Sequence, residues 1–184
     1  MLTIFDFLVI ITAVLAAFLD LKTRKIPNWL TLTMAATGLV GGFLISGWPG
    51  VLSGAQGWLV GIGVFLIPFI LGGMGGGDVK LMGAIGALKG VEFVLQTALL
   101  GALWGGLLAL LVICVKKRPG ILKRFGIGLK LFVLTDGKAG KELMLPDENA
   151  GAQERLYVPY GVAIFLGVLT SYLVDLKPLF LGKV

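Results

Sequence analysis

Long apolar runs alternate with short polar stretches along this chain. Residues 2–19, 30–45 and 59–74 form three such runs, and residues 158–174 form the last one. Each run approaches the roughly 20 residues that a helix needs to cross a bilayer. The pattern predicts an all-α membrane protein, built as a polytopic bundle of transmembrane helices.

The apolar stretch over residues 79–115 is too long for one crossing. Lys89, Gly90 and Glu92 lie within it, and each charge at the centre of a single long helix would cost about 2.5–3.5 kcal/mol. We therefore predict a helical hairpin that turns at these residues, which gives about six transmembrane helices in all. The first arm, residues 79–88, is short, so it either starts below the membrane surface or lies in a locally thinned bilayer.

Polar segments connect the runs. Pro27 ends the first helix, and the stretch SGWPG over residues 46–50 is expected to be a turn-rich connection. The segment 116–156 is predicted to be a cytoplasmic loop between spans five and six. Its first part is either an interfacial helix on anionic lipid or a solvated basic loop. Residues 1–184 are expected to form a single transmembrane domain.

The distribution of basic residues predicts the orientation in the membrane. In the six-span layout, thirteen of the 16 Lys and Arg residues fall on one side, and only Lys89, Lys177 and Lys183 fall on the other. Cytoplasmic loops collect basic residues, so both termini are expected outside a plasma (inner) membrane. We assign the net charge of +6 to this asymmetry and to anionic lipids rather than to nucleic acid.

The amino-acid composition limits the catalytic and metal-binding chemistry that the chain can carry out. Of the residues, 57% are hydrophobic and 14% charged, whereas soluble domains contain about 25% charged residues. The sequence has no His and a single Cys, Cys114, which excludes His-based triads, disulfides and Cys-cluster metal sites. Carboxylate chemistry remains.

Two acids stand out, Asp20 and Asp78. Asp20 closes the first span and Asp78 precedes the fourth, so both are predicted at the cytoplasmic membrane edge although they are 58 residues apart. Two carboxylates at a poorly hydrated interface cannot both ionise cheaply, so we expect them to share one proton, as an aspartic protease pair does. Asp78 could alternatively be a helix N-cap. Asp6, Glu92 and Asp175 are expected near the outer interface, where water hydrates them.

A glycine segment precedes Asp78. Gly75, Gly76 and Gly77 permit backbone conformations closed to other residues and allow another chain to approach, so an extended substrate could lie there. The alternative is a flexible connector or packing surface, and the pairs Gly57 with Gly61 and Gly101 with Gly105 are better explained by helix packing. Lys80 could support the ionised carboxylate, or it could extend to the membrane interface.

Three stretches of the sequence resemble prepilin peptidases, the GxGD-type aspartic membrane peptidases that include archaeal preflagellin peptidases. They are DLKTRKIPN from Asp20, GGGDVKLMGAIGAL over residues 75–88 and VPYGVAIFLG over residues 158–167. The combination of GxGD with a distant DxxxxxIPN and a late PYG is specific. The chain is similar to the short form found in tight-adherence pilus systems.

The resemblance implies a GxGD-type peptidase fold with Asp20 and Asp78 as the catalytic pair. It implies an endopeptidase that needs no metal or organic cofactor and cleaves the short basic leader from type IV pilin-like precursors at the cytoplasmic membrane face. The glycines Gly75 and Gly77 correspond to the family motif, and Gly75, Gly76, Gly77 and Lys80 are the expected substrate-binding residues. The longer family members carry paired Cys motifs and also methylate the new N-terminus. With Cys114 alone, methyl transfer is not expected here.

Two other classes of protein fit parts of the pattern. In a proton-coupled carrier, Asp20 and Asp78 would relay protons, but such carboxylates are normally needed at membrane depth. A noncatalytic subunit of a pilus or secretion machine would use the same apolar bundle, but it gives no reason for two convergent acids.

Overall fold

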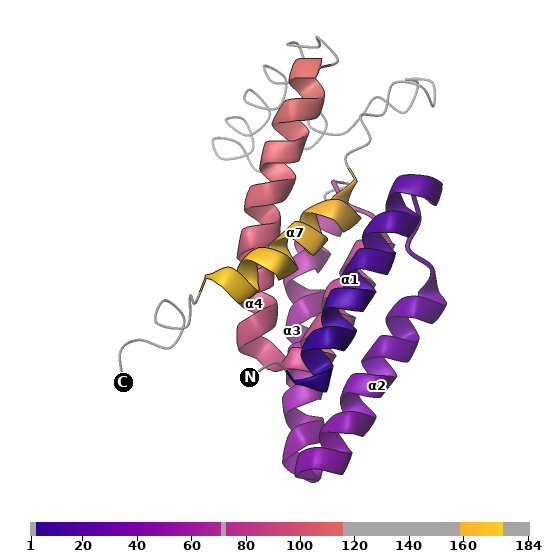
Figure 1. Ribbon diagram of the computed structural model, residues 1–184, viewed down its shortest axis with the longest axis vertical. Helices are drawn as coiled ribbons and strands as arrows, with labels where there is room; N and C mark the ends of the chain where they lie inside the picture. The colour runs from indigo at the N-terminus through magenta and orange to yellow at the C-terminus, as the bar shows by residue number, and fades with distance from the viewer. Residues whose placement is uncertain (1–2, 71–72, 116–158, 175–184) are drawn as a thin grey trace. The chain divides into compact units, whose positions relative to one another are not determined.

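The computed structural model describes residues 3–70, 73–115 and 159–174, and the regular elements within these ranges are all α-helices (Figure 1). The helices are α1 (Ile4–Thr23), α2 (Asn28–Ser46), α3 (Trp48–Ile70), α4 (Gly76–Val115) and α7 (Tyr160–Leu173). The chain divides into two compact units, Met1–Gly105 with Pro159–Val184, and Gly106–Val158. The contacts described below lie within the first unit.

Four helices of the described chain, α1 to α4, are long and apolar enough to cross a membrane, and α7 is a shorter apolar helix of 14 residues. The all-α character of the described chain is therefore confirmed, together with its membrane-type helices. Six crossings and a single domain remain predictions.

Helix α4 breaks at Gly90, whose φ of 80° and ψ of −174° are not helical. Before the break, α4 runs from Asp78, near the end of α1, to Lys89, which pairs with Asp6 near the start of α1. After the break, Thr97 lies within hydrogen-bond distance of Ser171 near the end of α7 (3.2 Å between the hydroxyls), whereas Gly105 lies beside Tyr160 at its start. The two arms therefore run in opposite directions, and the predicted hairpin at this position is confirmed.

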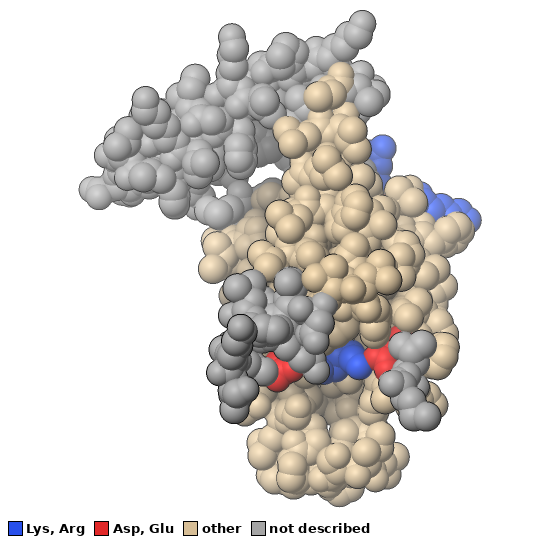
Figure 2. Space-filling view, turned by 60° about the vertical axis from the view of Figure 1, so that its left-hand side comes forward, with Lys and Arg blue, Asp and Glu red and all other residues tan. Residues whose placement is uncertain are grey.

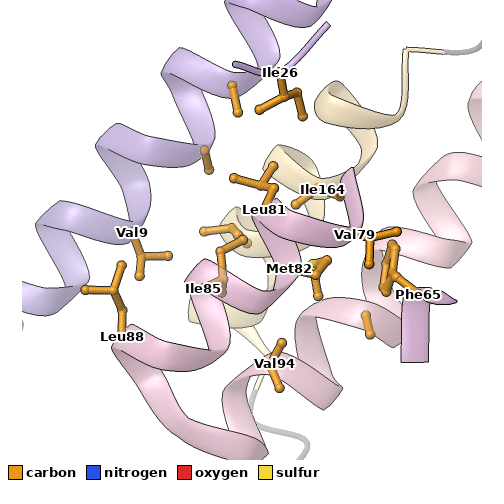
Figure 3. Close-up of a cluster of buried hydrophobic side chains, with 14 of the residues drawn as sticks. Val9, Ile26, Phe65, Val79, Leu81, Met82, Ile85, Leu88, Val94 and Ile164 are labelled. Carbon is orange, nitrogen blue, oxygen red and sulfur yellow. The ribbon is translucent and has the colours of Figure 1, made fainter. Parts of the chain in front are cut away.

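The first arm of α4 forms the centre of the unit (Figure 3). Its side chains are buried on nearly every side, and Leu81, Met82 and Ile85 are inaccessible to solvent. They pack against Val9 of α1 and Ile164 of α7. An arm that is apolar all round is suited to this place, because a helix without a polar face must be covered by neighbours.

Glycines allow the helices to approach this central arm closely. A Cβ atom at Gly57 or Gly61 of α3 would overlap backbone carbonyls of α4, and one at Gly38 of α2 would lie 2.6 Å from the carbonyl oxygen of Ala87. Gly101 and Gly105 lie against α7, where a Cβ at Gly167 would lie 2.8 Å from the backbone of Gly101, whereas one at Gly105 would be in ordinary contact, 3.4 Å from Tyr160. The packing role predicted for the spaced glycine pairs is confirmed.

Apolar side chains also cover the outside of the bundle. Phe7, Phe18, Leu44 and Ile67 each expose more than half of their surface. Figure 2 shows a largely uncharged face on which the charged side chains are confined to a few places. Such extensive apolar exposure is unusual for a soluble monomer and suits contact with lipid.

Several predicted boundaries differ from the structure. The segment SGWPG is not a turn-rich connection, because Gly47 alone, with φ of 64°, separates α2 from α3. Pro49 lies in the first turn of α3, where its missing N–H is tolerated. Pro27 does not end the first helix, because α1 ends at Thr23 and Pro27 is the N-cap of α2. Pro159 is likewise the N-cap of α7. The loop 116–156 with its possible interfacial helix, and Asp175, lie outside the described residues.

Candidate active site

Asp20 lies on the buried face of α1. This face is formed by Val9, Ala13, Ala16 and Asp20, whose spacing of three to four residues follows the helical period. The two alanines allow neighbouring helices to come close, and Asp20 is only 5% exposed. Its orientation into the bundle is therefore set by the same periodicity that packs α1.

Asp78 lies in the first turn of α4 and is 8% exposed. The backbone N–H of Gly75 donates to Asp78 Oδ2 over 3.2 Å, which is the return contact of a helix cap. The other oxygen, Oδ1, is buried and has no hydrogen-bond partner among the described residues. The alternative that Asp78 is the N-cap residue is therefore wrong, because α4 begins two residues earlier, at Gly76. The contact with Gly75 uses one oxygen of Asp78 and leaves the other available.

Both acids line one pocket of about 680 Å³. The two carboxyl groups lie within electrostatic range of each other. Its lining is completed by Leu19, by residues 23–29 from the end of α1 to the start of α2, and by Gly75, Gly76 and Gly77. The structure therefore brings together both predicted catalytic residues and the three predicted substrate-binding glycines.

The segment between α1 and α2 forms one wall of this pocket. Arg24 ends α1 in the left-handed conformation, with φ of 56°, and its N–H donates to the Asp20 carbonyl over 2.8 Å. Further along, Ile26 is buried directly against Gly77, where a Cβ atom would lie 3.0 Å from the Ile26 Cβ. The IPN segment and the glycine segment are thus packed together.

Lys80 joins the same two segments from outside. Its ammonium donates a hydrogen bond of 2.9 Å to the side-chain oxygen of Asn28, and its side chain is exposed. Lys80 does not itself line the pocket, whereas Asn28 does. Of the predicted substrate-binding residues, Lys80 is therefore at the rim and is bonded to the wall.

The start of α7 contacts Asp20 without lining the pocket itself. The backbone N–H of Gly161 donates to Asp20 Oδ2 over 2.9 Å. The neighbouring Tyr160 is partly buried and lies within range of the charge of Asp78. All three stretches of sequence that carry the resemblance meet at the two acids.

A second polar cluster lies at the opposite end of α1. Asp6 accepts hydrogen bonds from the ammonium of Lys89, from the hydroxyl of Tyr172 over 2.9 Å and from the hydroxyl of Thr3 over 2.7 Å. Asp6 is 3% exposed, so the expectation that water hydrates it is wrong. Glu92 is exposed as expected.

Sequence reasoning gave no role to Gly161, Asn28 or Asp6. Asn28 belongs to the stretch DLKTRKIPN and Gly161 to VPYGVAIFLG, so the two motifs could have pointed to these residues. For Asp6, the signal was the presence of an opposite charge, Lys89, at the same predicted end of the bundle. Within the described ranges, no group of three or more Cys, Asp or Glu side chains could hold a metal ion.

Comparison with known proteins agrees with this geometry. A model of the type IV leader peptidase family matches residues 7–110, more than half of the chain, and the chain belongs to this family. The match includes both acids and the glycine segment and ends before α7. No curated protein and no solved structure matches the chain. Family membership implies protease activity and prepilin-like substrates.

Proposed function

We propose that this protein is an aspartic endopeptidase that removes the short basic leader from type IV pilin-like precursors at the cytoplasmic face of the plasma membrane. The observation that carries this proposal is the pocket shared by Asp20 and Asp78, two buried acids 58 residues apart in sequence. Buried carboxylates in membrane proteins are costly and are usually retained for function.

The pair has the features needed to activate water. Two close carboxyl groups hold one proton between them. The ionised member removes a proton from water, whose oxygen attacks the carbonyl carbon of the scissile peptide bond, while the protonated member donates to the carbonyl oxygen. The acid that took the proton from water then gives it to the leaving nitrogen, and the other acid regains a proton from a hydroxyl of the tetrahedral intermediate. The C–N bond breaks, and the pair returns to its starting state. The mechanism requires no metal, cofactor or methyl donor.

The pocket wall suggests where the substrate binds. Gly75, Gly76 and Gly77 lie beside Asp78 and present backbone without side chains, so an extended peptide can approach the acids closely. Asn28 in the pocket wall and Lys80 at the rim would contribute to binding this peptide. The apolar segment that follows the cleavage site in such a precursor would pack against the apolar exterior of the bundle.

The charge pattern supports a cytoplasmic site. Arg24 and Lys25 line the pocket, and Lys80 lies at its rim. Basic residues collect on the cytoplasmic side, and a basic leader would remain on that side for the same reason. The single basic residue described at the other end of the first unit, Lys89, is neutralised by Asp6.

A proton-coupled carrier is the main competing function. It would need ionisable groups at membrane depth. Between Asp6 and Asp20, however, the buried face of α1 carries Val9, Ala13 and Ala16 together with Thr12, and no acid. The lack of an acid on this buried face favours a peptidase over a proton relay.

The test is cleavage by the purified protein in vesicles that contain anionic lipid. A purified pilin-like precursor is added, and both products are identified by mass. We expect a single cut between the basic leader and the apolar segment. An intact precursor after incubation with folded protein, or a proton flux across the vesicle membrane without cleavage, would refute the proposed activity.

A further inference from the structure

We propose that the first turn of α7 is a positioning element of the catalytic site, in which the backbone N–H of Gly161 fixes the carboxylate of Asp20 for water activation. This inference rests on the proposed aspartic mechanism. It gives a role to the PYG segment, which lies beyond the family match.

The N–H of Gly161 is free to serve Asp20 because it lies at the start of a helix. The first N–H groups of a helix have no partner within the helix itself. Pro159, the N-cap, has no N–H, and its carbonyl instead accepts from Val162 over 3.1 Å. The Gly161 N–H donates to Asp20 Oδ2 over 2.9 Å across a sequence separation of 141 residues.

The contact leaves no room for a side chain at position 161. A Cβ atom there would lie 2.8 Å from Asp20 Cβ and 2.9 Å from Asp20 Oδ2. The Cβ of Asp20 is attached to the α1 backbone and cannot rotate away, so a methyl group would force α1 and α7 apart or displace the carboxylate. Glycine at this position therefore allows the N–H to reach the acid.

The two acids are held differently. Asp20 is fixed by a helix that comes from the far end of the sequence, whereas Asp78 is held by Gly75, three residues before it in the chain. A shift of α7 would thus move Asp20 relative to Asp78. A displacement of about 1 Å at a reacting group can reduce a rate about 100-fold.

The experiment compares three glycine-to-alanine variants for precursor cleavage in vesicles. Gly161→Ala is expected to reduce kcat on the order of 100-fold, with KM changed by less than about threefold because the pocket wall is untouched. Gly63→Ala is the matched control in open space, since nothing lies within 4 Å of its added Cβ. It should cleave as the parent does.

Gly167→Ala controls for packing on the same helix. Its Cβ would lie 2.8 Å from the backbone of Gly101, away from the acids, so it should lower thermal stability but spare kcat per folded molecule. Equal losses of kcat in Gly161→Ala and Gly167→Ala, or parental kcat in Gly161→Ala, would overturn the positioning role. Asp20→Asn is measured alongside: if it still cleaves, the aspartic mechanism fails instead.

One further measurement leaves Gly161 unaltered, in case its variant does not fold. The amide proton of Gly161 is followed by NMR in the ¹⁵N-labelled protein and in Asp20→Ala, which removes the acceptor. We expect a clear upfield shift of this proton when the hydrogen bond is lost. An unchanged resonance would show that the N–H does not bind Asp20, and the inference would be wrong.

Discussion

The carboxylate of Asp6 and the ammonium of Lys89 form an ion pair that joins the start of α1 to the turn of the α4 hairpin. The ammonium also lies 5.4 Å from the centre of the Phe93 ring, which packs at 5.1 Å against the ring of Tyr172. The pair therefore connects α1, both arms of α4 and α7 at the end of the bundle opposite the two catalytic candidates.

Loss of one partner of this ion pair should destabilise the protein more than loss of both. Asp6→Asn leaves the Lys89 charge without its partner, and Lys89→Met does the same to Asp6. Removal of one member of a buried pair costs about 3–5 kcal/mol, and about 2–4 kcal/mol is expected here because Lys89 is partly exposed. Thermal unfolding in detergent, read by circular dichroism, should show the double variant as more stable than either single variant. Additive losses would argue against the pairing.

The hydrogen bond between Lys80 and Asn28 should affect activity more than stability. It is exposed, so its contribution to folding is small. It holds the pocket wall against the start of α4, and its loss in Lys80→Met or Asn28→Ala should raise KM several-fold, with the unfolding temperature within a few degrees of the parent. Lys22→Met is the control, since it removes an exposed charge of α1 that does not line the pocket. A KM equal to that of the parent in both rim variants would exclude this role.

The helices, the hairpin and the two acids could be predicted from the sequence. Apolar runs and the charges around Gly90 can be recognised locally in the sequence. Because a charge buried in lipid is costly, such charges indicate where a membrane helix ends. Asp20 and Asp78 could be paired because both lie at predicted membrane edges on the same side.

The contacts of Asp6 and Gly161 could not be predicted in the same way. Periodicity shows which face of one helix is buried, but it does not show which residues of two distant helices meet. Asp6 is paired only because α4 turns back at the level of Lys89, and Gly161 meets Asp20 only because α7 begins beside the end of α1. Both contacts depend on tertiary packing.

The charge asymmetry makes a direct prediction about topology. Cys114 is the only cysteine, so its replacement by Ser allows single cysteines to be introduced elsewhere. Cysteines at Lys22 and Lys25 should react with a membrane-impermeant maleimide only after the cells are opened, whereas one at Gly47 should react in intact cells. Reaction of the position 22 variant in intact cells would contradict the predicted orientation.

Chelation should leave cleavage unaffected, because the proposed step uses two carboxyl groups alone. Precursor cleavage after dialysis against EDTA is expected to proceed at the parental rate within error. Loss of activity that returns only on addition of a divalent cation would contradict the mechanism.

The role of the acid pair is tested most directly by cleavage rates of Asp20→Asn, Asp78→Asn and the double variant, at matched amounts of folded protein. Each substitution keeps the shape of the side chain and removes its ability to exchange a proton. We expect cleavage to be abolished in each single variant and to be no lower in the double variant, since the two groups act as a unit. Glu92→Gln, an exposed acid at the hairpin turn, should retain the parental rate. Near-parental cleavage by either Asp20→Asn or Asp78→Asn would contradict the account.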